Sequence, residues 1–80
     1  MIYNNTPTLI QERWKLGTDQ SDVALRNNYS TDLMMVYYNG LLINNNIHYT
    51  YSESSKQLSF LGFSAEAGDI LTVMQISTTG

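Results

Sequence analysis

The chain of 80 residues has no cysteine and only one histidine, His48. Disulfide bonds and thiolate zinc sites are therefore excluded, and a histidine-based metal cluster is not expected. A single domain of this length buries only roughly 60 to 65% of its unfolded surface, so its core alone supplies only a few kcal/mol of stability. We therefore expect the protein to oligomerise or to join a larger assembly.

Charged residues are also scarce. They make up 14% of the chain, against roughly 25% in ordinary soluble domains. The net charge of −3 opposes binding to nucleic-acid phosphates and to anionic membrane surfaces, so we expect no nucleic-acid partner. Asn, Ser, Thr and Tyr fill the polar positions, and protein interfaces bury such groups more readily than Lys or Glu. This composition favours contact with other protein.

Long apolar runs are missing. No stretch of about 18 apolar residues occurs, and no basic and apolar leader opens the chain. We expect neither membrane insertion nor export by the usual secretory route.

The sequence lacks the common catalytic motifs. It has no Gly-x-Ser-x-Gly elbow, no phosphate loop, no metal-ligand spacing and no cysteine nucleophile. The only conceivable acid/base pair is His48 with Glu53, Glu66 or Asp69, but a lone histidine on the polar side of a strand is far more often a surface residue. We predict that the protein is not an enzyme and has no catalytic, cofactor-binding or metal-binding residues. Turn geometry after Gly68 explains Asp69.

Residues 33–43 contain a strong hairpin signal, because two apolar and aromatic runs flank Asn39-Gly40. A type I′ turn needs positive φ at both central residues, which asparagine tolerates and glycine adopts freely. We predict strands over 33–38 and 41–43, joined by this turn.

Alternating apolar residues predict four further strands, over 9–16, 23–26, 47–51 and 58–61, and a run that is apolar on both faces predicts a fifth over 70–77. In the first of them Glu12 interrupts an otherwise apolar side, and in 47–51 we expect Ile47 to point inward with Tyr49 and Tyr51. No segment supports a helix. The prediction is an all-β fold, a small antiparallel β-sandwich of about six or seven short strands. Residues 9–77 would form the sandwich domain, 1–8 an extended N-terminal arm and 78–80 a loose C-terminal tail.

Residues 23–76 contain three short motifs at the ends or starts of predicted strands. They are Val36-Tyr37-Tyr38-Asn39-Gly40 at a strand end, His48-Tyr49-Thr50, and Ala65-Glu66-Ala67-Gly68-Asp69-Ile70 before the last strand. With these motifs the chain resembles a β-sandwich module of tailed-bacteriophage virion proteins, notably tail fibres and related appendages. The resemblance implies a structural subunit of the virion, such as a tail or head fibre, an appendage or a capsid decoration protein. Its partners would be other copies of itself and other virion proteins, and it would reside in the virion after synthesis in the host cytoplasm.

The apolar surface indicates where such assembly would occur. Strand 70–77 is apolar on both faces, which is more hydrophobic surface than one small core can cover. The candidate assembly contacts are Ile2, Tyr3, Ile70, Thr72, Met74 and Ile76.

An alternative function is a carbohydrate-binding module that recognises a host-surface glycan. Exposed aromatic rings stack on sugars, and here Trp14, Tyr3 and Tyr29 are the candidate rings. The competing interpretation is that aromatic rings at strand spacing pack within the core or across strands.

Overall fold

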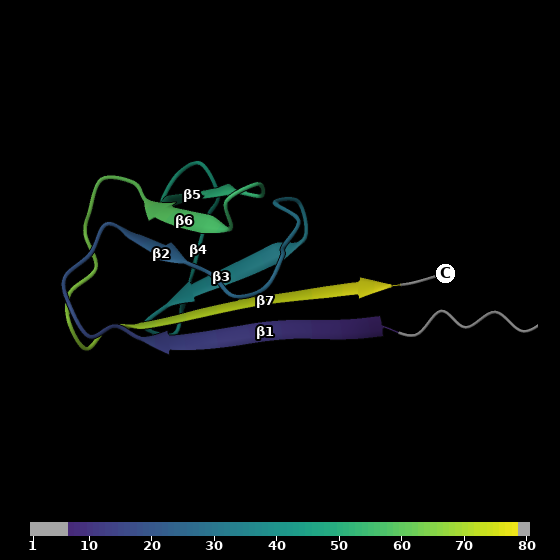
Figure 1. Ribbon diagram of the computed structural model, residues 1–80, viewed down its shortest axis with the longest axis horizontal. Coiled ribbons are helices and arrows are strands. Elements are labelled where there is room, and N and C mark those ends of the chain that lie inside the picture. The colour runs from purple at the N-terminus through teal and green to yellow at the C-terminus, as the bar shows by residue number, and fades with distance from the viewer. Residues whose placement is uncertain (1–6, 79–80) are drawn as a thin grey trace, which may run out of the picture.

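The computed structural model describes residues 7–78, and within this range it contains seven β-strands and no helix. The strands form two antiparallel sheets, in the orders β1-β7-β3-β4 and β2-β6-β5, which pack on each other (Figure 1). The prediction of an all-β fold built as a small antiparallel sandwich is confirmed. The strands are β1 (Pro7–Lys15), β2 (Asp22–Ala24), β3 (Met34–Tyr38), β4 (Leu41–Ile43), β5 (Tyr49–Ser52), β6 (Gln57–Phe60) and β7 (Ile70–Thr78).

The first and last strands are neighbours, and they form the longest pairing of the molecule. β1 and β7 pair from Pro7–Thr78 to Lys15–Ile70. On its other side β7 pairs with β3, which reaches only as far as Gln75. The pairs beyond Gln75 therefore belong to a two-stranded ribbon that projects past the other strands (Figure 1).

All seven predicted strands are present; five begin at a different residue, three of them by a single position and two, β1 and β5, by two positions. The predicted boundaries of the arm and the tail are wrong at three residues: Pro7 and Thr8 belong to β1 and Thr78 belongs to β7, because the backbones of the two strands pair there. β5 starts at Tyr49 instead of residue 47.

The prediction that Ile47 points inward is wrong, because Ile47 is 66% exposed. The backbone N–H groups of Ile47 and His48 both donate to the carbonyl of Asn44, at 3.3 and 2.9 Å. Asn46 has a φ of 63°, in the left-handed region that asparagine tolerates. The run of three asparagines thus extends the turn through residue 48 and moves Ile47 out of the strand.

The core lies between the two sheets. Its largest fully buried side chains are Val36, Leu71 and Val73 from one sheet and Tyr49 and Leu58 from the other. Successive side chains of a strand point to opposite faces, so every core residue on a strand has outward-facing neighbours. This alternation divides the larger sheet into a covered face and an open one.

A buried carboxylate ties β1 to the body of the domain. Glu12 is only 8% exposed and accepts hydrogen bonds from the backbone N–H of Arg26 (2.9 Å) and of Asn27 (3.0 Å). It also accepts from Trp14 Nε1 (2.6 Å) and from the Tyr29 hydroxyl (2.8 Å). Burial acts to raise the pKa of Glu12, but these hydrogen bonds outweigh it and hold the pKa below the ordinary value. The residue that interrupts the apolar pattern is therefore a charged anchor.

Replacing this anchor is expected to destabilise the fold in a pH-dependent way. Glu12→Gln retains the shape but turns an amide NH₂ toward groups that donate hydrogen bonds, so we expect the free energy of unfolding at pH 7 to fall by about 2 to 4 kcal/mol. Because folding lowers the Glu12 pKa, its contribution is present above the unfolded pKa and is lost as the pH falls through the folded pKa. Urea denaturation of both proteins at several pH values measures this difference.

The matched control is Glu66→Gln, at an exposed position, which should change stability by no more than about 0.5 kcal/mol. If the gap between wild type and Glu12→Gln stays constant down to acidic pH, the charge of Glu12 is not what stabilises the fold.

Candidate functional site

The candidate site is the open face of the larger sheet, which we call the outer face and define as the side chains of β1-β7-β3-β4 that point away from β2-β6-β5. On β7 the buried residues alternate with half-buried or exposed ones. The latter residues are Ile70, Thr72, Met74 and Ile76. The β7 residues that we identified as candidate contacts therefore share the outer face. The other two candidates, Ile2 and Tyr3, lie outside the described residues.

The strand register adds apolar residues from the neighbouring strands. Met35 pairs with Met74, Leu9 with Ile76, and Leu42 with Tyr37. The side chains of Leu9, Leu42 and Ile76 are 53%, 56% and 54% exposed. The apolar members of the outer face are Leu9, Met35, Tyr37, Leu42, Ile70, Met74 and Ile76.

Sequence reasoning missed Leu9, Met35, Tyr37 and Leu42 as members of this surface. Met35 and Tyr37 had a signal, because residues 33–38 are apolar at both alternate sets of positions. Leu9 and Leu42 had none, since only the strand order places them beside β7 and β3.

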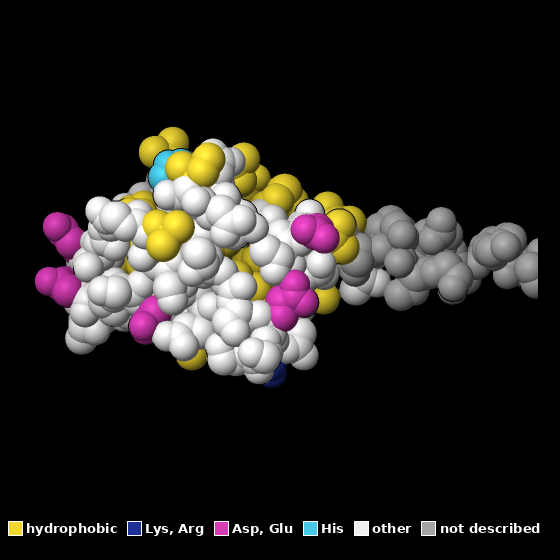
Figure 2. All heavy atoms as spheres, turned by 90° about the horizontal axis from the view of Figure 1, so that it is seen from above, with side chains coloured by type: hydrophobic (Ala, Val, Ile, Leu, Met, Phe, Trp, Pro, Cys, Tyr) yellow, Lys and Arg dark blue, Asp and Glu magenta, His cyan; other side chains and the backbone are white. Residues whose placement is uncertain are grey.

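No third layer covers the outer face within residues 7–78, where the chain forms only these two sheets. Figure 2 looks down on the opposite side of the molecule and shows polar surface with separate acidic side chains and several apolar groups. Exposed apolar side chains are therefore not confined to the outer face, since Leu33, Ile47 and Leu61 are also exposed.

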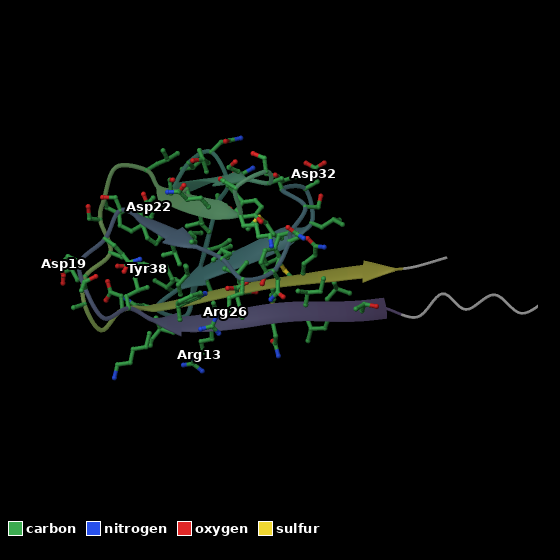
Figure 3. The ribbon with its side chains drawn as sticks, in the orientation of Figure 1. Arg13, Asp19, Asp22, Arg26, Asp32 and Tyr38 are labelled. Carbon is green, nitrogen blue, oxygen red and sulfur yellow. The ribbon has the colours of Figure 1, made fainter. Side chains whose placement is uncertain are left out.

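The few charges on the outer face are basic and lie on its edge strand. Arg13 and Lys15, two of the four basic residues of the chain, occupy the outward positions of β1, and Arg13 extends away from the sheets (Figure 3). The described strand positions of this face hold no Asp or Glu. An apolar centre with a polar edge is the usual organisation of a protein interface.

An open hollow lies on the outer face near the β3–β4 turn. It is shallow rather than enclosed. Its lining residues are Arg13, Tyr37, Asn39, Gly40, Ile70, Thr72 and Met74.

Hydrogen bonds hold the β3–β4 turn against the start of β7, and we call this arrangement the turn clamp, formed by Asn39, Asp69 and Ile70. The backbone N–H of Asn39 donates to the Ile70 carbonyl (2.8 Å), and the Ile70 N–H donates to Asn39 Oδ1 (2.8 Å). Asn39 Nδ2 donates to Asp69 Oδ1 (3.1 Å). Two of the motifs that carry the family resemblance are therefore in contact, although they are far apart in the sequence.

The glycines of these motifs are required by their backbone conformation. Asn39 and Gly40 have φ values of 51° and 84°, which confirms the predicted turn with positive φ at both central residues. Gly68 has a φ of 94°. A Cβ atom at either glycine would meet no other atom within 4 Å, so conformation and not crowding excludes larger residues here.

Tyr38 joins the turn clamp to the core. Its ring packs on Phe60 and Phe63, with centroids 5.7 and 5.3 Å away, and its hydroxyl donates to Asp69 Oδ2. Burial raises the pKa of Tyr38 to about 12, and the bond to Asp69 acts in the same direction. The pKa of Asp69 is held below its ordinary value by Tyr38, then by the backbone N–H of Glu66 and by the Asn39 amide. The backbone N–H of Glu66 donates to Asp69 Oδ2 (2.8 Å) and closes the turn over residues 66–69, so Asp69 has the structural role in this turn that the sequence predicts.

The rings proposed for glycan stacking are not assembled into an exposed platform. Tyr29 is buried at 4% exposure and packs edge-to-face on Tyr51. Trp14 is half-buried, and the Arg26 guanidinium lies 4.3 Å above its ring. Tyr3 lies outside the described residues. Trp14 and Tyr29 instead supply hydrogen bonds to the Glu12 anchor.

The described part of the chain also shows how its titratable and apolar groups are distributed. Among residues 7–78, no three His, Cys, Asp or Glu side chains gather as metal ligands. His48 accepts a hydrogen bond from the backbone N–H of Asn44 through Nδ1 (3.0 Å), so its ring is part of the turn. No helix in this range is long and apolar enough to cross a membrane.

No family model, curated protein or solved structure matches the chain.

Two tyrosines, Tyr29 in the core and Tyr38 beside the turn clamp, are expected to limit stability at high pH. Burial also raises the pKa of Tyr29 to about 12, so Tyr29 and Tyr38 remain protonated in the folded state when they ionise in the unfolded chain near pH 10. Their contribution is complete below the unfolded pKa and is lost as the pH rises through the folded one. Stability should therefore decline between pH 10 and 12. Absorbance titration of the phenolates in wild type and in Tyr38→Phe tests this assignment. The variant should lose one group that ionises near pH 12. Loss of a group that ionises near pH 10 would contradict the assignment.

Proposed function

We propose that the protein is a structural subunit of a tailed-bacteriophage virion, in a fibre, appendage or decoration layer, and that it acts by protein–protein assembly through the outer face. One observation supports the assembly role: apolar side chains from all four strands of the larger sheet line a face that residues 7–78 leave uncovered. Exposed patches of this kind mark partner sites in soluble proteins. The resemblance of the motifs supports the virion setting.

The partner on this face is a second copy of the chain. A small domain without disulfides gains stability most readily by oligomerisation, and most soluble oligomers are formed by identical subunits. The outer face suits this role, since its centre is uncharged and its basic residues lie on the edge strand.

The projecting ribbon of β1 and β7 supports the same conclusion. Leu9 and Ile76 pair with each other there, beyond the reach of β3, and both are more than half exposed. A two-stranded ribbon alone is only marginally stable in water. Contact with a neighbouring copy would cover this apolar pair and stabilise the ribbon.

A charge in the centre of the outer face should dissociate the assembly without unfolding the domain. In Met74→Lys the flexible lysine stem can lie along the sheet with its ammonium group in water, so the monomer should keep its fold. A central interface residue typically contributes enough that its loss weakens association roughly 10- to 100-fold. Sedimentation velocity across a range of concentrations measures the change, and circular dichroism checks the fold.

Thr50→Lys is the matched control, because Thr50 is an exposed residue on β5 in the other sheet. It should leave association unchanged. Wild-type protein that remains a folded monomer at every concentration would overturn the proposal, and measurable affinity of that monomer for oligosaccharides would support glycan recognition instead.

A further inference from the structure

We infer that Asn39-Gly40 is a site of spontaneous deamidation and that the turn clamp slows this reaction in the folded protein. Asn39 is the only asparagine in the chain that precedes glycine. Glycine has no side chain to hinder its own backbone nitrogen, so asparagine before glycine is the most reactive context for this modification. This modification would limit the chemical durability of the protein whether or not the protein assembles.

The reaction needs only water. The backbone nitrogen of Gly40 attacks Cγ of Asn39, and a C–N bond forms as the bond between Cγ and Nδ2 breaks. The proton from the Gly40 nitrogen leaves with the amide nitrogen as ammonia, and a cyclic succinimide remains. Water then opens the ring at either carbonyl, which yields aspartate or isoaspartate at position 39.

The turn clamp opposes the first step because it holds both ends of the reacting amide. Asn39 Oδ1 accepts from the Ile70 N–H at 2.8 Å, and Nδ2 donates to Asp69 Oδ1 at 3.1 Å. Rotation of the amide during the attack on Cγ is therefore opposed by both bonds. The backbone bond from Asn39 N–H to the Ile70 carbonyl (2.8 Å) also restrains the residue itself.

The carboxylate of Asp69 is itself fixed in position. Its other oxygen accepts from the Tyr38 hydroxyl and from the Glu66 N–H. These bonds aim Asp69 Oδ1 at the Asn39 amide, so Asp69 is a positioning residue that holds the amide in the turn clamp.

Modification would open the clamp irreversibly. Aspartate at position 39 would place a second carboxylate beside Asp69, where the amide now donates, and like charges at this separation repel. Isoaspartate would also add a methylene group to the backbone of the turn. Because the turn fixes the pairing of β3 with β4, this insertion would displace Leu42 from its place on the outer face.

The test compares deamidation rates with and without the clamp. Wild type and Asp69→Ala are incubated folded at the same pH and temperature, and modification of Asn39 is quantified by mass spectrometry of the peptide that contains it. Wild type unfolded in urea serves as the unprotected reference. Folded wild type should react most slowly, and Asp69→Ala roughly tenfold faster, since one of the two side-chain bonds of the amide is absent.

Val23→Ala separates local protection from global stability, because Val23 is a core residue of β2 in the other sheet and the clamp stays intact. It should react at a rate close to that of wild type. If Asp69→Ala fails to fold, Asp69→Asn, which retains the shape and one acceptor, replaces it and should also exceed Val23→Ala. Equal acceleration by the clamp variant and Val23→Ala would overturn the inference, as would folded wild type reacting as fast as in urea.

Discussion

The hydrogen bonds to the Glu12 carboxylate hold the inward face of the first strand against the domain. Within the described chain β1 pairs only with β7, and it is attached to the rest of the domain by the bonding of Glu12 to Arg26, Asn27 and Tyr29 and by the packing of Ile10 and Trp14 against the core. A slip of one residue in the pairing would turn every side chain of the strand over and leave these donors without the carboxylate. The anchor, together with Ile10 and Trp14, thus sets Leu9 and Arg13 on the outer face.

The turn clamp performs the corresponding task for the other end of the sheet. It ties the β3–β4 turn to the first residues of β7, which keeps Leu42, Tyr37 and Thr72 in line across three strands. The two devices differ in chemistry, because one is a buried carboxylate with several donors and the other a half-exposed network of amide and carboxylate groups. Together they make the outer face a fixed surface assembled from distant parts of the chain.

The local features of this fold were predictable from sequence, and the long-range ones were not. Alternation identified the strands, and Asn39-Gly40 identified its turn because positive φ selects those residues. Ile47 was misplaced because the asparagine turn overrides alternation. The role of Glu12 was hidden, since its main-chain and hydroxyl donors lie 14 to 17 residues away. The β7 residues of the outer face were predictable from the apolar pattern of their own strand. Their neighbours on β1, β3 and β4 were not, because strand order joins segments that are distant in the sequence. The residue types of Trp14 and Tyr29 favour a glycan platform, but in the fold both donate hydrogen bonds to the Glu12 carboxylate.

The most direct test of this account is an NMR titration of the Glu12 side-chain carboxyl carbon in the wild-type protein. If the carboxylate is the satisfied anchor described above, its pKa lies below the ordinary value of 4.5. A pKa at or above 4.5 would mean that burial dominates over the hydrogen bonds, and the claim that Glu12 fixes β1 and its outer face would then be wrong.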